Sequence, residues 1–492
     1  MSYKDLRDYI HKLEDKKLLK RVGVEVSTDL EISAIMEKLV QEGGVAAIFE
    51  NVVNEKGKKI DMPIIANLYG TRERVKLGLN ATEEELKEIG EFIALLQRPK
   101  PPEGIVDAIK KMPVYGKALT IGPKTVFTGK CQEVVLTGED ATLDKLPIIK
   151  CWPKDVGSLI TWPLVITAPP GDMEKGPQNV GVYRMQKLDG KRAIMRWLPQ
   201  RGGARHQRLW KEKGEAMPVA IAIGCEPATT IAAVTPVPEE IGEFHFAGVL
   251  RKKAIELVKC KTIPLRVPAS SEIVLEGEIR HGDLEKEGPF GDHTGYYNAE
   301  EKFPVFHLKA ITHRKKPYYL TTITGRPPKE DAIIGTVLNT LYLPSLKLQM
   351  PEVVDFSLPM EAVSYRIAVV SIKKSYPGHA KRVMMGLWGL LKQFLYVKYI
   401  IVVDEDIDVH NWSDVIWAMS TRVDPGRDTF VIEDTPMDYL DFSSPKDGLG
   451  SKMGIDATNK IGSEVTRPWG EKMTMSEDIL ERIEKKWKEF KF

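Results

Sequence analysis

Three polar clusters hold the residues of this sequence whose types and spacing are best suited to chemistry. The first is Asn179-Val180-Gly181-Val182-Tyr183-Arg184. If this stretch is a strand, alternation places Val180, Val182 and Arg184 on one face. An arginine among valines is costly unless an anion meets it. Either a structural carboxylate or an anionic substrate could serve, and the stretch alone leaves both open.

The second cluster is Arg196-Trp197-Leu198-Pro199-Gln200-Arg201-Gly202-Gly203. Its two arginines and paired glycines would let guanidinium groups and backbone N–H groups come close to a phosphate. The tryptophan could pack against a flat ring. A tight turn with surface arginines is the alternative interpretation.

The third cluster is Glu287-Gly288-Pro289-Phe290-Gly291-Asp292, followed by His293. Its two acids lie on a Gly/Pro-rich segment, so a loop rather than helical spacing must place them. One protonated carboxylate beside an ionised one that contacts an arginine would be suited to proton transfer. A solvated turn is the alternative. Glu243 is a further candidate acid, because it opens an apolar helical stretch.

Composition excludes several other classes of function. The chain has 71 Lys and Arg against 69 Asp and Glu, and this balance favours neither nucleic acid nor anionic membranes as partners. Its four cysteines form no C-x-x-C pair, which argues against a zinc ribbon or a dithiol redox site. P-loop and G-x-G-x-x-G motifs are absent. The acidic run 404–408 follows an apolar strand and is interpreted as a solvated loop rather than a metal site.

The same composition predicts a cytoplasmic protein of several domains. At 492 residues the chain is too long for one hydrophobic core. The charged N-terminus does not resemble a signal peptide, and no apolar run reaches 18 residues.

The elements that must position the clusters change character along the chain. Residues 1–115 alternate helical and strand patterns and predict an α/β domain. Residues 116–325 contain many short apolar runs punctuated by Gly, Pro and Asn, which favour an antiparallel barrel or sandwich, with helices near 205–213 and 243–250. Residues 326–470 return to βαβ order and predict a second α/β domain. An amphipathic helix is expected within 471–492.

Taken together, the clusters resemble the UbiD family of decarboxylases. The likeness runs from about Tyr3 to about Trp469. The further stretches that carry it are Cys151-Trp152-Pro153, Ile160-Thr161-Trp162, Thr235-Pro236-Val237-Pro238, Val267-Pro268-Ala269-Ser270, Thr324-Gly325-Arg326-Pro327-Pro328, Gly378-His379-Ala380-Lys381-Arg382 and Leu449-Gly450-Ser451-Lys452-Met453-Gly454. The resemblance implies an α+β chain whose central domain is a split β-barrel of the flavin-reductase-like type.

The resemblance also implies a cofactor, prenylated FMN, supplied by a separate flavin prenyltransferase. Its phosphate would be bridged to the protein by Mn²⁺ or Mg²⁺, with a monovalent cation such as K⁺ close by. Asn179 and Glu243 match the metal ligands, and oxygen ligands suit such hard ions. Gln200 stands where relatives often have a histidine ligand. The cofactor-contacting positions implied are Val182, Tyr183, Arg184, Arg196, Trp197, Leu198, Gln200, Arg201 and Gly202.

The catalytic residues implied are Arg184, Glu287 and Asp292. Arg184 would hold the substrate carboxylate and pair with Glu287, and Asp292 would donate the proton that replaces CO₂. His293 and Lys381 are nearby candidates without an assigned role. Within the family the likeness is greatest to decarboxylases of 4-hydroxy-3-polyprenylbenzoate, which give 2-polyprenylphenol in ubiquinone-type quinone biosynthesis.

Three alternatives remain. The chain could act reversibly on another aromatic acid, such as a naphthoate of menaquinone synthesis or a phenolic acid. It could be a flavin-binding oxidoreductase, or a non-catalytic subunit, against which the intact catalytic set argues. The expected partners are an aromatic carboxylic acid, further copies of the chain in a homo-oligomer such as a hexamer, and, for a lipid-tailed substrate, at most the membrane surface.

Overall fold

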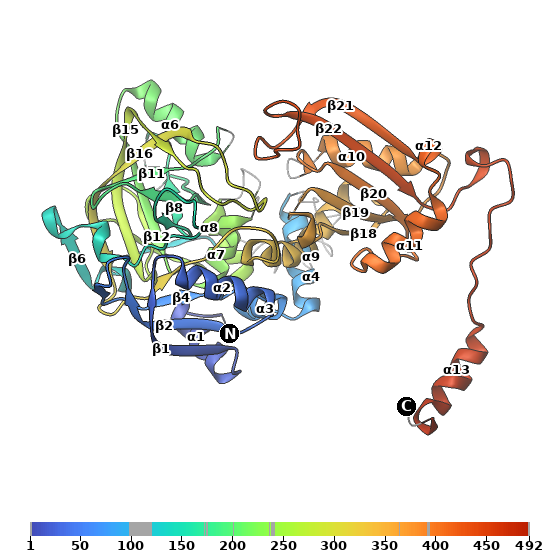
Figure 1. Cartoon of the computed structure of the whole chain (residues 1–492), viewed down its shortest axis with the longest axis horizontal. Coiled ribbons are helices and arrows are strands. Elements are labelled where there is room, and N and C mark those ends of the chain that lie inside the picture. The colour runs from blue at the N-terminus through green and yellow to red at the C-terminus, as the bar shows by residue number, and fades with distance from the viewer. Residues whose placement is uncertain are drawn as a thin grey trace, which may run out of the picture.

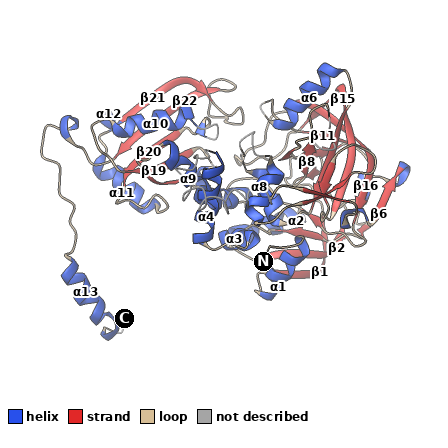
Figure 2. Ribbon diagram, turned by 180° about the vertical axis from the view of Figure 1, so that it is seen from behind, coloured by secondary structure: helices blue, strands red, loops and turns tan. Residues whose placement is uncertain are grey.

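The computed structural model describes residues 2–97, 121–171, 173, 176–199, 201–235, 237, 242–363, 365–390 and 394–490. Figures 1 and 2 show a large lobe built by the N-terminal and central parts of the chain and a smaller C-terminal lobe. Helices α4 and α9 lie between the two lobes (Figure 1). The mixed α/β class expected from the sequence is confirmed.

The N-terminal part is an α/β unit. Its elements are α1 (Leu6–Asp15), β1 (Leu19–Ser27), α2 (Glu31–Gln41), β2 (Ala46–Val53), β3 (Lys59–Ile60), β4 (Ile64–Ala66), α3 (Arg72–Leu79) and α4 (Glu83–Gln97). Strands β1 and β2 are parallel, whereas β2 and β4 are antiparallel. The expected boundary near residue 115 lies outside the described residues.

The central part is dominated by strands. They are β5 (Lys124–Val126), β6 (Val134–Thr137), β7 (Leu159–Ile160), β8 (Leu164–Thr167), β9 (Asn179–Val182), β10 (Met185–Lys187), β11 (Arg192–Met195), β12 (Met217–Ile223), β13 (Glu256–Lys259), β14 (Arg266–Pro268), β15 (Ile273–Glu287), β16 (Glu301–His313) and β17 (Tyr319–Leu320). Helices α6 (Gly202–Lys213), α7 (Pro227–Val234) and α8 (Glu243–Arg251) are inserted between them, and α6 and α8 lie where the sequence predicts helices.

Chain connectivity requires the central sheet to curl. Its strand order is β7-β10-β11-β16-β15-β12-β8-β9, so β9 and β10 lie near opposite ends. Six steps between flat strands would separate them by about 29 Å. However, only Tyr183 and Arg184 join Val182 of β9 to Met185 of β10, and three Cα steps span at most about 11 Å. The sheet must therefore close on itself, as a barrel does.

The N-terminal and central parts share one hydrophobic core. A single cluster of buried side chains runs from Leu6 on α1 through Ile221 on β12 to Leu341 on α9. Strand β17, at the end of the central part, also pairs in parallel with β4. The large lobe is consequently one packed body.

The C-terminal part is a five-stranded α/β sheet of order β18-β19-β20-β22-β21. Its elements are α9 (Glu330–Gln349), β18 (Val353–Ser357), β19 (Ile367–Ile372), α10 (His379–Leu390), β20 (Tyr399–Asp404), α11 (Trp412–Arg422), α12 (Pro425–Asp428), β21 (Thr429–Pro436) and β22 (Leu449–Ala457). Alternation along β19 sends Val370 into the core that includes α10, whereas Val369 joins the core that includes α11. Helices thus cover both faces.

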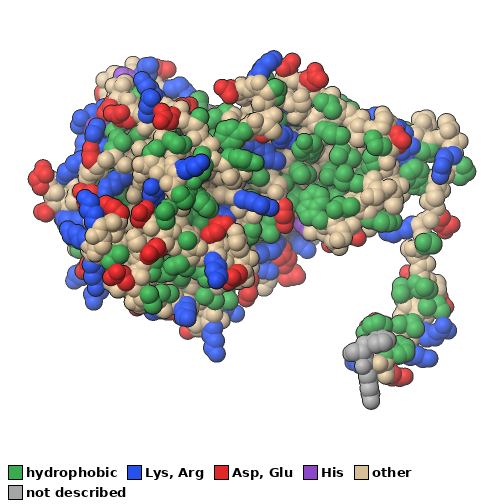
Figure 3. Space-filling view, in the orientation of Figure 1, with side chains coloured by type: hydrophobic (Ala, Val, Ile, Leu, Met, Phe, Trp, Pro, Cys, Tyr) green, Lys and Arg blue, Asp and Glu red, His purple; other side chains and the backbone are tan. Residues whose placement is uncertain are grey.

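A last helix, α13 (Glu477–Lys486), stands apart from both lobes at the end of an extended segment (Figures 1 and 3). Residues 477–490 are exposed except for Ile479, which is half-buried. Within the described part of the chain, none of the helices is both long and apolar enough to cross a membrane.

Candidate functional site

Arg184 occupies the two-residue connection that joins the ends of the curled sheet. The sequence predicts a strand that continues through Arg184, and this expectation is wrong, because β9 ends at Val182 and β10 begins at Met185. The chain must leave one edge of the sheet and enter the other there. The guanidinium carbon of Arg184 lies 5.4 Å from the centroid of the Phe290 ring.

The Arg184 guanidinium binds both acids of the third cluster. Its Nε donates to Glu287 Oε1 at 2.8 Å, and Nη2 donates to Glu287 Oε2 at 3.2 Å, which makes a bidentate pair. Its Nη1 donates to Asp292 Oδ2 at 2.8 Å. The structure therefore brings Arg184, Glu287 and Asp292 into direct contact.

Arg196 is the second cation of this cluster. Its Nη1 donates to Glu287 Oε2 at 3.2 Å and lies 3.9 Å from Asp292 Oδ2. Its Nη2 donates to the hydroxyl of Tyr439. The resemblance implies a cofactor contact for Arg196, whereas the structure places its guanidinium with the two carboxylates.

The charges of this cluster stabilise one another. Burial alone would lower the pKa of Arg184, but the charges on Asp292 and Glu287 outweigh it and raise that pKa. Burial alone would raise the pKa of Asp292, yet the hydrogen bond from His293 and the charges of Arg184, His293 and Arg196 hold that pKa well below its usual range. These contacts favour the ionised form of the Asp292 carboxyl.

The strand β15 and the loop after it deliver the two acids. Glu287 is the last residue of β15, where the strand turns back from exposed to buried positions. Asn298 closes the loop, because its Oδ1 accepts from Arg184 Nη2 at 3.0 Å and from the N–H of Phe290 at 2.9 Å. Gly291 is required for packing, since a Cβ there would lie 2.2 Å from Cδ1 of Trp152.

Asn179 and Glu243, the residues matched to metal ligands, lie side by side. Glu243 is the first residue of α8, and its Oε2 accepts from the N–H of Val180 at 3.0 Å. Burial raises the pKa of Glu243, partly opposed by that N–H, and no described cation contributes. The buried Nδ2 of Asn179 has no hydrogen-bond partner among the described residues. A half-buried carboxylate without a cationic partner among the described residues, and an amide oxygen on the adjacent strand, have the ligand chemistry that suits a hard divalent cation.

The cofactor-contacting positions surround the start of α6. The helix begins at Gly202, whose backbone packs closely against Asn179. Tyr183 and Trp197 make an edge-to-face pair, with ring centroids 5.8 Å apart. Arg201 is exposed and Leu198 is half-buried. Backbone N–H groups at a helix N-terminus suit a phosphate, so the residues present fit the phosphate end of a flavin nucleotide. Gln200 lies outside the described residues.

Several neighbours of the cluster are missed by sequence reasoning. Asn298 lies just beyond the third cluster. A polar amide in this Gly-rich loop could have been predicted to hydrogen-bond to the neighbouring charged residues. Tyr365, Asp438 and Tyr439 come from the C-terminal domain, and no local pattern links them to the cluster. The acidic run 404–408 is not a separate metal site, because Arg422 pairs with Asp404 at 2.7 Å and with Asp406 at 2.8 Å.

Comparison with known proteins identifies the family. Three models for 3-octaprenyl-4-hydroxybenzoate carboxy-lyase match this chain: the N-terminal domain at residues 10–93, the Rift-related domain at 124–327 and the C-terminal domain at 332–457.

Solved structures agree over nearly the full length. The UbiD-class enzyme HmfF from Pelotomaculum thermopropionicum, in complex with FMN, is 30% identical, with 96% of this chain and 97% of that chain covered and a TM-score of 0.79. An evolved dimeric form of HmfF in complex with prFMN is 28% identical, with the same coverage and a TM-score of 0.77.

A second relative is the vanillic acid decarboxylase of Sedimentibacter hydroxybenzoicus. Its closed form is 29% identical and has a TM-score of 0.85, and 100% of this chain and 99% of that chain are covered. With family models over all three parts and near-complete structural matches, this chain belongs to the UbiD family of carboxy-lyases.

Proposed function

We propose that this protein catalyses the prenylated-FMN-dependent, non-oxidative decarboxylation of an aromatic carboxylic acid. The observation that carries the proposal is the Arg184 side chain, only 15% exposed and held between Glu287 and Asp292. Glu287 holds Arg184 through two hydrogen bonds, whereas Asp292 accepts only one, from Nη1, so the substrate carboxylate could replace Asp292 there while Glu287 keeps the arginine in place. The FMN and prFMN held by HmfF and the substrate named for vanillic acid decarboxylase support the same chemistry.

Each residue would have a separate task. Arg184 would bind and orient the substrate carboxylate through its fork of N–H donors. Glu287 would keep Arg184 and Arg196 in place and balance their charge. Asp292 would deliver a proton to the carbon that CO₂ leaves. Prenylated FMN, when bound, would supply the electron sink.

The metal and the phosphate would lie at the other end of the site. Asn179 and Glu243 would hold Mn²⁺ or Mg²⁺, and Gln200 is a third candidate ligand. The N–H groups at the start of α6 would bind the phosphate. Tyr183 and Trp197 would line the cofactor, and K⁺ would be an additional ion.

The proposal is tested by producing the chain together with a flavin prenyltransferase. The purified protein should contain prenylated FMN and a divalent metal, and it should release CO₂ from an aromatic acid. A flavin-binding oxidoreductase would instead retain turnover when Glu287 is replaced. Purified protein that holds no flavin and releases no CO₂ from any acid tested would contradict the proposal.

The proposed substrate is 4-hydroxy-3-polyprenylbenzoate, whose decarboxylation gives 2-polyprenylphenol. The names of the three family models support it, whereas a solved relative acts on vanillic acid. A panel of 4-hydroxy-3-prenylbenzoates, vanillic acid and a hydroxynaphthoate separates these substrates by kcat/KM. A preference for an acid without a prenyl chain would overturn the quinone assignment and leave the reaction type intact.

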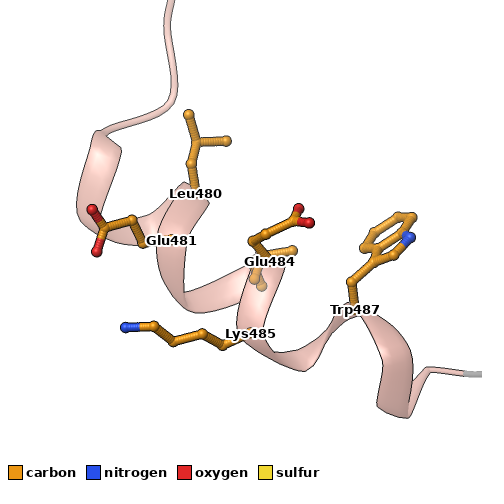
Figure 4. A pocket seen from close by; sticks show the side chains of 6 residues that line it. Leu480, Glu481, Glu484, Lys485 and Trp487 are labelled. Carbon is orange, nitrogen blue, oxygen red and sulfur yellow. The ribbon is translucent and has the colours of Figure 1, made fainter.

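We further propose a homo-oligomer, such as a hexamer, that forms through the C-terminal part. Helix α13 and the turn after it support this, since Leu480 and Trp487 project to one side, with Glu484 between them, whereas Glu481 and Lys485 project away from it (Figure 4). Light scattering should show a smaller assembly when residues 471–492 are deleted. An unchanged mass would contradict a role for this helix in assembly.

A further inference from the structure

His293 lies between the site acid Asp292 and the C-terminal domain. Its Nδ1 is 2.8 Å from Asp292 Oδ1, which also accepts from the His293 backbone N–H at 2.7 Å. Its Nε2 is 3.2 Å from the hydroxyl of Tyr365. Both ring nitrogens therefore have oxygen partners, and these partners belong to different parts of the chain.

The hydrogen bonds around Tyr365 determine which way the protons point. The Tyr365 hydroxyl donates its one proton to Asp438 Oδ2 at 2.6 Å. Its oxygen can then only accept from His293, so Nε2 must carry a proton. Asp292 is ionised and accepts from Nδ1, so that nitrogen must carry one too. The network is satisfied when His293 is a doubly protonated imidazolium.

The electrostatics agree with this hydrogen-bond pattern. Burial alone would lower the pKa of His293, but the hydrogen bond and charge of Asp292, with the charges of Asp331 and Asp438, raise it above its usual value. Among the described residues, the carboxylates that raise this pKa and the Tyr365 hydroxyl come from the loop after β15, from α9 and from the C-terminal domain.

Asp438, the last acceptor in this series of hydrogen bonds, is itself held in place by two further donors. Arg366 Nη2 donates to the same Oδ2 of Asp438 at 3.2 Å, and the N–H of Leu440 donates to Asp438 Oδ1 at 3.0 Å. Asp438 is buried and cannot readily turn toward solvent. The hydrogen bond to Tyr365 is thereby fixed in direction.

We infer that Tyr365 and Asp438 are positioning residues that hold His293 as the proton store for Asp292. This inference rests on the proposed decarboxylation. When a substrate carboxylate displaces Asp292 from Arg184, Asp292 loses a charge partner and takes the Nδ1 proton of His293. Asp292 then gives this proton to the carbon whose bond to CO₂ has broken, and water reprotonates the imidazole. Proton delivery thus depends on the C-terminal domain being seated on the barrel.

The direct test is the pKa of His293 in the full-length protein, measured by NMR of ¹⁵N-labelled histidine and assigned with His293→Gln. In Tyr365→Phe and Asp438→Asn the pKa should fall by about one unit, because Nε2–H loses its acceptor or the acceptor loses its anion. Tyr439→Phe is the matched control. It removes a hydroxyl from the neighbouring interdomain hydrogen bond to Arg196 and should leave this pKa unchanged.

Turnover of the holoenzyme provides the second measurement. Tyr365→Phe and Asp438→Asn should lower kcat several-fold, and by at most about tenfold, at pH 8, because a fall of one pKa unit lowers the protonated fraction of His293 by no more than that. They should lower it less at pH 6, where His293 stays protonated, and KM and the flavin spectrum should not change. If Tyr365 and Asp438 served only to maintain the fold, the loss of kcat in both variants would be the same at pH 6 and pH 8.

The two measurements separate the inference from the proposed function. If wild-type protein releases CO₂ while both variants keep its His293 pKa and its pH profile, the inference is wrong. If wild-type holoenzyme releases no CO₂, the proposed function is wrong, and the NMR titration still decides whether Tyr365 and Asp438 hold His293 in its protonated form.

Discussion

Asn179 Oδ1 lies so near the backbone of Gly202 that a Cβ atom at that glycine would come within 1.9 Å of it. The start of α6 and the candidate metal ligand are therefore in direct contact. A side chain at Gly202 would displace Asn179 from the position of a candidate metal ligand and obstruct the helix N-terminus.

Gly202→Ala should lower the content of bound flavin and metal at least about tenfold, because shifting a metal ligand or its support typically costs 10–100-fold in affinity. Flavin absorbance and metal analysis of the purified protein measure this. Gly335→Ala on α9 is the matched control, since a Cβ there meets nothing within 4 Å. Equal cofactor content in both variants would contradict the role given to Gly202.

Glu287→Gln should reduce kcat by about 100-fold or more, because Arg184 and Arg196 lose the anion that orients them. It should also lower the free energy of unfolding by about 1–3 kcal/mol, since a buried hydrogen-bonded charge is removed. Steady-state kinetics and urea unfolding report the two effects. Glu285→Gln changes an exposed position on the same strand and should leave both nearly unchanged.

Glu243→Gln should abolish stabilisation by metal. In wild-type protein, Mn²⁺ at about 100 times its dissociation constant should add about 2.7 kcal/mol to the free energy of unfolding. The variant should show no such gain, because the anionic ligand is lost. The melting temperature with and without a chelator measures this, and an equal metal response in the variant would remove Glu243 from the ligand set.

Glu330→Gln should raise stability above pH 7. Burial raises the pKa of Glu330 to about 7, so the folded protein favours its neutral form. The unfolded chain ionises near pH 4.3, and stability is therefore lost as pH rises from about 4.3 to about 7. A glutamine avoids this loss. Melting temperatures at pH 4 and pH 8 should show the gain only at pH 8, and the same gain at both would disprove the assignment.

Local sequence patterns predicted the elements that bury a continuous apolar run or a single face. The short apolar runs of the central part are strands such as β8, and α6 and α8 lie where helices near 205–213 and 243–250 are expected. The helix α9 was not predicted, because it packs on several sides and has no single apolar stripe; its buried positions include Glu330 and Asn339 as well as Ile333.

The site was predictable where its residues lie close in sequence and not where two domains meet. The acids of the third cluster and Arg184 could be grouped before the fold was known. The strand break at Arg184 could not, because it follows from closure of the sheet. Tyr365 and Asp438 lie on loops of a domain whose placement depends on packing by α9, which local patterns do not encode.

The division of the site between two domains separates what must stay constant from what can vary. Arg184, Glu287 and Asp292 are bonded within the central domain, and the C-terminal domain contacts their neighbours, with Tyr365 on His293 and Tyr439 on Arg196. Substitutions in the C-terminal domain away from these contacts should thus leave the arginine–carboxylate bonds intact. For protein engineering, the neighbours of Tyr365, Asp438 and Tyr439 on these loops are the first positions to diversify in a search for new acids, with those three residues kept.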